Sequence, residues 1–206
     1  MPIKRLSPRN QAKKFLDDLL RRKIQALIIR LDFVGLECIR EARINRKYTD
    51  QTGNLRSSTG YCVLYNGKVV KRSSFEVVKP TATKGAKEGN DFMSKLISEN
   101  SKGIVLIVVA GMNYARYVEK MGLNVLDSSE MLAKKLVPRM LKDLGFKKEH
   151  LKSNRTFSMY LTYSLPEKSP GRSICKIVDL LTLKRRMLLL LFPPEMQSKS
   201  KTDALA

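Results

Sequence analysis

Three close pairs of carboxylates are the residues most suited to acid–base or metal chemistry. Nucleases hold magnesium with several clustered carboxylates. The pairs are Asp17 with Asp18, Glu37 with Glu41, and Asp127 with Glu130. The first pair has basic neighbours and is typical of surface charge, while ion pairs with Arg40 or Arg43 explain the second more simply. The third has the spacing of a helix capping box, so no pair predicts a magnesium cluster.

The cysteines and the histidine do not form a metal-binding pattern. Cys38, Cys62 and Cys175 are far apart, and His150 is the single histidine. A zinc site needs about four nitrogen or sulfur ligands at workable spacing. We therefore expect no metal site, and we expect reduced thiols in a reducing cytosol.

Nucleophile and nucleotide motifs are also missing from the sequence. Ser57 and Ser58 lack the signature of a nucleophile elbow. The stretch 80-PTATKGAKEGN-90 has glycines and lysines but no Gly-Lys-Ser or Gly-Lys-Thr, so it predicts a mobile loop and not a phosphate loop. We expect no enzymatic activity and no cofactor, with a nuclease as the weakest of three hypotheses.

Aromatic residues beside the expected strands and helices could stack on bases, or they could be core. The glycine and aromatic pattern of an RNA-binding sheet is absent, and aromatic residues in such places are more often buried. We expect a core role for Tyr61, Tyr65, Phe75, Tyr114 and Tyr117.

Charge is the unusual feature of the composition. The 206 residues include 40 Lys and Arg against 19 Asp and Glu, a net charge of +21 that is spread along the chain. Such a chain is expected to meet an anionic neighbour, either nucleic acid or an acidic protein. The N-terminus lacks the apolar core of a signal peptide, and the apolar runs 104–112 and 187–192 are too short to span a bilayer.

The periodicity predicts an α+β fold in which a long N-terminal helix and further helices pack on a small, mainly antiparallel sheet. We divide the chain into a basic arm (1–10), an α+β domain (11–146) and an extension of unknown structure (147–206). Residues 11–46 form one amphipathic helix, with a break expected near Gly35. Its basic residues are candidate contacts for DNA or an acidic partner: Arg21, Arg22, Lys23, Arg30, Arg40, Arg43 and Arg46.

Turn and strand signals follow this helix. Asn66-Gly67 predicts a two-residue hairpin between strands at 61–65 and 68–70, and 104–110 predicts a central strand covered on both faces. The remaining expected elements are a strand at 75–78, a helix from Asn90 or Asp91 to Ile97, a helix at 112–121 ended by Gly122, a helix at 128–144 kinked at Pro138, and a strand at 156–165. The stretch 174–192 is compatible with helix or strand.

Two ordered segments resemble the signatures of one family. The segment 52-TGNLRSS-58 resembles TG-x-LR-x-S, and 113-NYARYVEKMG-122 resembles YA-x-YVE-x-G. These signatures belong to the tail-completion, or minor tail component, proteins of long-tailed bacterial viruses, named after the tenth gene product of a lambdoid phage. The likeness covers roughly residues 11–146. The chain departs from the family at Gly122-Leu123, where many members have Gly-Thr, and beyond about residue 150.

The resemblance implies a virion structural subunit of the neck, assembled in the cytoplasm of a host bacterium. Such subunits form a homo-oligomeric ring around the DNA channel, between the portal or connector and the tail tube, where non-specific contact with double-stranded DNA would use the positive charge. The matching positions are Thr52, Gly53, Leu55, Arg56, Ser58, Tyr114, Ala115, Tyr117, Val118, Glu119 and Gly122. We expect fold-keeping roles for them first, with Arg56 paired to a carboxylate such as Glu119, and a role between subunits second. The alternative function is a basic nucleic-acid-binding module without catalysis.

Overall fold

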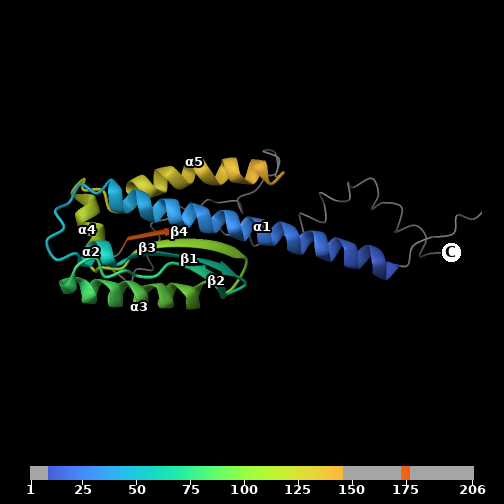
Figure 1. The fold of residues 1–206 in the computed structure, drawn as a ribbon, viewed down its shortest axis with the longest axis horizontal. Coiled ribbons are helices and arrows are strands. Elements are labelled where there is room, and N and C mark those ends of the chain that lie inside the picture. Colours follow the sequence, from blue (N-terminus) through green and yellow to red (C-terminus); the bar gives the residue numbers. More distant parts are fainter. Residues whose placement is uncertain (1–8, 146–172, 177–206) are drawn as a thin grey trace, which may run out of the picture.

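The long N-terminal helix and the small sheet define the architecture of the computed structural model, which describes residues 9–145 and 173–176 (Figure 1). The helices are α1 (Arg9–Ile44), α2 (Asn54–Ser57), the 3₁₀ turn η1 (Pro80–Ala82), α3 (Thr83–Glu99), α4 (Ala115–Lys120) and α5 (Asp127–Asp143). The strands are β1 (Thr59–Tyr65), β2 (Lys68–Arg72), β3 (Ile104–Ala110) and β4 (Ser173–Lys176). The predicted α+β class is confirmed.

The sheet is antiparallel throughout, in the order β2-β1-β3-β4. The predicted hairpin is confirmed, because Asn66 (φ 50°) and Gly67 (φ 77°) join β1 to β2 with the two positive φ angles that such a turn requires. Strand β4 comes from the extension, so the chain beyond residue 146 supplies one edge of the sheet. The expected strand at 156–165 and most of 174–192 lie outside the described residues.

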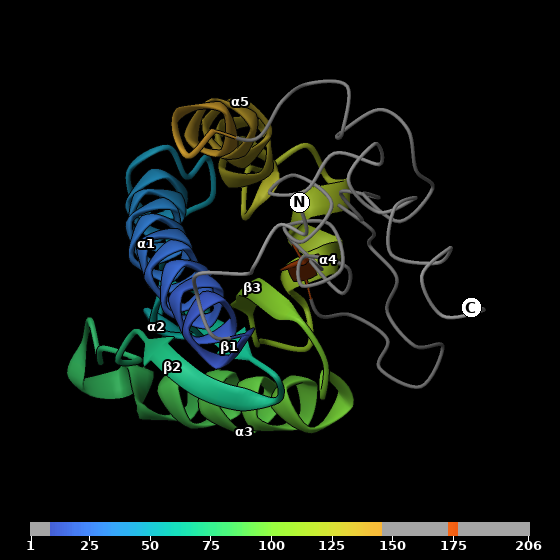
Figure 2. The same cartoon turned by 90° about the vertical axis from the view of Figure 1, so that its right-hand side faces the viewer.

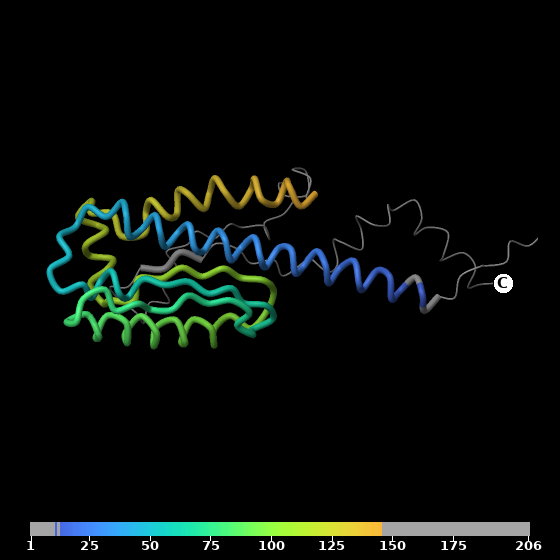
Figure 3. Tube along the Cα trace, viewed as in Figure 1, coloured from blue at the N-terminus to red at the C-terminus, as the bar shows by residue number. Residues whose placement is uncertain are grey.

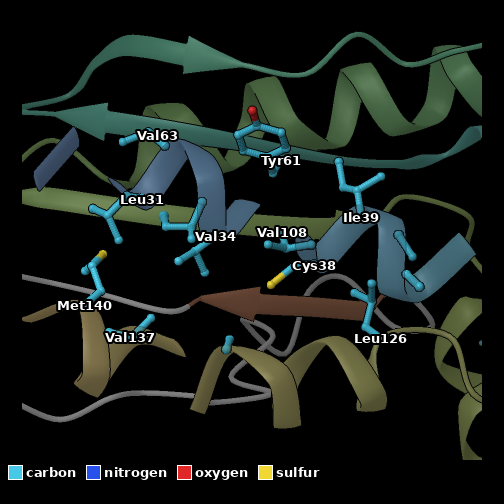
Figure 4. Close-up of a cluster of buried hydrophobic side chains, with 14 of the residues drawn as sticks. Leu31, Val34, Cys38, Ile39, Tyr61, Val63, Val108, Leu126, Val137 and Met140 are labelled. Carbon is cyan, nitrogen blue, oxygen red and sulfur yellow. The ribbon is translucent and has the colours of Figure 1, made fainter. Parts of the chain in front are cut away.

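Helices cover both faces of the sheet (Figure 2). Helix α3 covers one face, where Cys62, Phe92 and Ile107 are buried together. Helices α1 and α5 cover the other, where Leu31, Val63 and other side chains form the larger core (Figure 4). Alternate residues of β3 point into the two cores, which explains why this apolar run is buried at every position, as its sequence predicted.

Helix α1 is continuous, so the expected break near Gly35 was wrong (Figure 3). A Cβ added at Gly35 would lie 2.3 Å from Cδ2 of Tyr61, so the glycine allows α1 to lie directly against this ring. The Tyr61 hydroxyl donates a hydrogen bond to Oδ1 of Asp32 (2.7 Å) and thereby ties β1 to α1. This glycine serves close packing and not a bend.

The segment between β2 and β3 differs most from the sequence predictions. Residues 75–78 are not a strand; Phe75 instead packs against the core beneath α3, with its ring beside Gly60 and Gly89. The expected mobile loop at 80–90 is η1 and the first half of α3, so the helix begins at Thr83 and not at Asn90 or Asp91. A Cβ at Gly85 would lie 2.1 Å from the backbone oxygen of Asn54, which shows that α3 packs through this glycine against α2.

Two further helix predictions need correction. The helix expected at 112–121 is the shorter α4, although Gly122 (φ 76°) follows its C-terminus as predicted. Helix α5 runs through Pro138, but the expected Asp127–Glu130 capping box is not formed. Glu130 instead pairs with Lys134 at 2.7 Å.

Candidate functional site

The first motif, residues 52–58, forms the corner between α1 and β1. Gly53 has φ 77°, which suits glycine, and it precedes α2. Ser58 is fully buried: its hydroxyl donates to the Leu55 carbonyl (2.7 Å) and accepts from the Met112 amide (3.3 Å). The Thr52 carbonyl accepts a hydrogen bond from the Thr81 hydroxyl (3.0 Å). The motif is therefore bonded both to the segment that follows β3 and to η1, the turn that precedes α3.

The second motif, residues 113–122, forms α4 and the turn after it. Ala115 and Glu119 are buried, and Oε1 of Glu119 accepts a hydrogen bond from the Leu126 amide at the start of α5 (2.9 Å). Among the ion pairs of the described residues, none joins Arg56 to Glu119, so that predicted pairing was wrong. Glu119 fixes α5 relative to α4, a role that a buried carboxylate can fill by capping backbone N–H groups.

The two motifs meet at one hollow, which we call the motif hollow. Its volume is about 490 Å³. Thr52 and Leu55 of the first motif and Tyr114 and Val118 of the second lie in its wall. The complete lining is Tyr48, Thr49, Asp50, Gln51, Thr52, Leu55, Tyr114, Val118 and Leu123. Segments 60 residues apart in sequence thus build a single surface feature.

The motif hollow has tyrosine walls and a carboxylate. Burial, and then the charge of Asp50, raise the pKa of Tyr48 to about 12, and the same two causes raise the pKa of Tyr114. Both phenols therefore remain neutral at physiological pH. Oδ2 of Asp50 is buried and accepts no hydrogen bond from the described residues. Lys79 donates to the backbone carbonyls of Asp50 and Gln51, which holds this loop in place.

The aromatic predictions divide into two groups. Tyr61 is buried, and Tyr65 and Phe75 pack at the edge of a core, as expected. Tyr114 is 39% exposed and Tyr117 is 72% exposed, so the expectation that both are core residues was wrong. Both belong to the second motif, and Tyr114 lies in the wall of the motif hollow.

The predicted basic contacts of α1 also divide into two groups. Arg30 pairs with Asp143 (3.7 Å), Arg40 with Glu37 (3.5 Å) and Arg43 with Glu76 (2.9 Å). Arg46 donates to the backbone carbonyl of Arg43 (3.1 Å). Exposed pairs of this kind contribute about 0–1 kcal/mol.

The other group is Arg21, Arg22 and Lys23, which are exposed in the N-terminal half of α1. This half extends beyond the sheet and α5 (Figure 1), and the first buried side chain described on α1 is Leu27. The structure therefore does not gather the seven cations on one face.

Helix α1 has a second apolar face, which we call the outer stripe and which was not predicted from the sequence. Ile29, Phe33, Leu36 and Ile44 are 53–65% exposed. The first three follow buried Leu27, Leu31 and Val34 by two residues, which places them about 200° round the helix from the core. Their three- and four-residue spacing was present in the sequence, but it merged with that of the buried face.

Within the described ranges, no helix has both the length and the hydropathy needed to cross a bilayer. The same residues contain no group of three or more His, Cys, Asp or Glu side chains placed to hold a metal ion. Comparison with known proteins found no matching family model, no matching curated protein and no matching solved structure.

Proposed function

We propose that this chain is a structural subunit of a phage virion, a neck or tail-completion protein that forms a homo-oligomeric ring around the DNA channel. The ordered pair of motifs is the basis in sequence. The observation that carries the proposal is the outer stripe of α1, together with the meeting of both motifs at one surface hollow.

The outer stripe supports self-association because α1 is apolar on two opposite sides. One side is buried in the subunit core, and the other exposes Ile29, Phe33 and Leu36 in a row. Fully burying a large apolar side chain contributes about 1.5–3 kcal/mol, and soluble monomers rarely leave such contiguous rows uncovered. In a ring, the same face of every subunit is covered by its neighbour.

Native mass measurement and particle imaging of the purified chain test this proposal. We expect discrete rings, and we expect Phe33→Glu to convert them to single subunits, because a carboxylate in an apolar contact must lose its hydration. Met131→Glu on α5, at a side chain that is 61% exposed, is the matched control and should still assemble. A chain that stays a single subunit at every concentration would contradict the proposal.

The second candidate function is non-specific nucleic-acid binding, favoured by Arg21, Arg22 and Lys23. These three consecutive exposed cations extend away from the body of the subunit. In a ring they could contact DNA in the channel, and in a single subunit they could bind DNA directly. DNA binding by Phe33→Glu, the variant expected not to assemble, distinguishes the two candidates: binding that persists in the single subunit favours the second.

A further inference from the structure

We propose that the motif hollow receives a lysine or arginine side chain from a second copy of this chain, with Asp50 as its anionic partner. This inference rests on the proposed homo-oligomer. It names the contact through which the two motif segments would join neighbouring subunits.

Asp50 is suited to a cationic partner that the described residues of its own subunit do not supply. Its Oδ2 atom is buried in the wall of a hollow of about 490 Å³ and has no hydrogen-bond partner among the described residues. A buried carboxylate oxygen without a partner costs free energy, which an incoming ammonium or guanidinium would recover. Lys79, the cation bonded to this loop, binds backbone carbonyls and not the Asp50 carboxylate.

The aromatic walls suit the same ligand. Tyr48 and Tyr114 lie near enough to Asp50 for its charge to affect both rings, and both remain neutral phenols. The faces of aromatic rings attract cations. Arg46 and Arg56 also act on Tyr48, but no ion pair within 4.0 Å joins either of them to Asp50 in the described part of the chain. Asp50 therefore lines the same hollow as Tyr48 and Tyr114, and no ion pair among the described residues neutralises its carboxylate.

A second copy is the occupant that the charge and geometry favour. Lys and Arg outnumber Asp and Glu by 40 to 19, so each copy offers many cations and few carboxylates. The exposed cations at Arg21, Arg22 and Lys23 lie about 40 Å along α1 from the motif hollow of the same subunit, too far to reach it. A contact between a cation and a hollow on different surfaces is head-to-tail, and such contacts form a ring when the rotation between neighbouring subunits closes.

The test compares Asp50→Asn, Asp50→Glu and the control Asp91→Asn, which changes an exposed carboxylate on α3. Two quantities are measured: the dissociation constant of the assembly by native mass, and the melting temperature of the dilute, unassembled subunit. We expect Asp50→Asn to raise the dissociation constant tenfold or more while leaving the subunit's melting temperature equal or higher. Asp50→Glu keeps the charge and should stay within a few-fold of the starting protein, as should Asp91→Asn.

Two outcomes would overturn the inference while leaving the proposed function intact. One is assembly of Asp50→Asn with an unchanged dissociation constant, which would mean that the hollow holds only water. The other is a clear fall in the melting temperature of the isolated Asp50→Asn subunit, which would assign Asp50 a role within the fold. Failure of the unmodified chain to associate at any concentration would overturn both proposals.

Discussion

At the residue scale, Cys38 and Cys62, the two cysteines whose side-chain burial the structure describes, are structural and not reactive. Cys38 and Cys62 are fully buried, on opposite sides of the sheet, and burial raises the pKa of each thiol to about 12. Cys38 also exchanges hydrogen bonds with Ser129: its Sγ donates to the Ser129 carbonyl, and the Ser129 hydroxyl donates to the Cys38 carbonyl (2.6 Å). Thiols held neutral in this way are poor nucleophiles, and this pair fastens α1 to α5.

The cysteine pKa values predict a loss of stability in alkaline solution. In the unfolded chain each thiol ionises near pH 9, whereas in the fold it stays protonated to about pH 12. The unfolded state therefore binds fewer protons than the folded state between these pH values. The stability that each neutral thiol contributes is complete below pH 9 and falls by about 1.4 kcal/mol per pH unit as the pH rises to 12.

Urea unfolding of the starting protein and of Cys62→Ala, at several pH values from about 8 to 11, measures this effect. We expect Cys62→Ala to be less stable than the starting protein at pH 8, because the substitution leaves a cavity. Above pH 9 its free energy of unfolding should fall less steeply with pH, and the two slopes should differ by roughly 1 kcal/mol per pH unit. Lysine and tyrosine ionisation is common to both proteins and cancels in the comparison. Equal slopes would show that the Cys62 thiol is not held neutral.

At the element scale, glycines set how closely α3 approaches the rest of the subunit. A Cβ at Gly89 would lie 2.8 Å from the Ser58 carbonyl oxygen, and one at Gly111 would lie 2.4 Å from the Gly89 Cα. The backbones of α3, β3 and the first motif therefore meet without intervening side chains. The glycines that make 80–90 resemble a flexible loop are the ones that fix α3 in place.

This packing also explains which elements the sequence could predict. The helix of α1, the Asn66-Gly67 turn and the apolar strand β3 depend on periodicity and local turn chemistry, so local patterns found them. The start of α3 depends on Asn54, which is 31 residues away in sequence, and the cap of α5 depends on Glu119 of the preceding helix instead of the expected capping box, so neither follows from a local helix-start pattern. The same limit applies to the motif hollow. The sequence identified the motif residues, but only the tertiary structure shows that the two motifs lie together and that Asp50 lines the hollow with them.

Gly85→Ala distinguishes close packing from flexibility. In an exposed helix, alanine is more favourable than glycine by about 1 kcal/mol. Here the added Cβ would meet the Asn54 backbone, which cannot rotate away as a side chain could. We expect Gly85→Ala to lower the free energy of unfolding by roughly 1–3 kcal/mol. Lys87→Ala, at an exposed position of α3, should be close to neutral, and thermal unfolding of both variants measures the difference.

A stabilising effect of Gly85→Ala would contradict this packing and would favour the loop that the sequence alone suggested. Alanine also restricts the unfolded chain, so replacing a glycine that is free of contacts is expected to raise the free energy of unfolding.

At the scale of the whole molecule, the positive charge is divided between a body and a projection. Within the body, Arg30, Arg40 and Arg43 are already paired with carboxylates. In the projecting half of α1, Arg21, Arg22 and Lys23 stand on a helix that extends past the sheet (Figure 3). If DNA is a ligand, the three cations of the projection can approach phosphates without first breaking any ion pair that joins described residues.

The salt dependence of DNA binding tests this division. Each phosphate contact contributes about −0.9 to the slope of log affinity against log salt. Replacing Arg21, Arg22 and Lys23 by Gln should therefore reduce the magnitude of the slope by about 2–3, measured by fluorescence anisotropy with a labelled duplex between about 50 and 200 mM salt. The matched control replaces Arg30, Arg40 and Arg43 by Gln, which removes the same charge from the body and should largely preserve the slope. An equal reduction of the slope in both triple variants would show that DNA binding depends only on the net charge of +21 and not on the projecting helix.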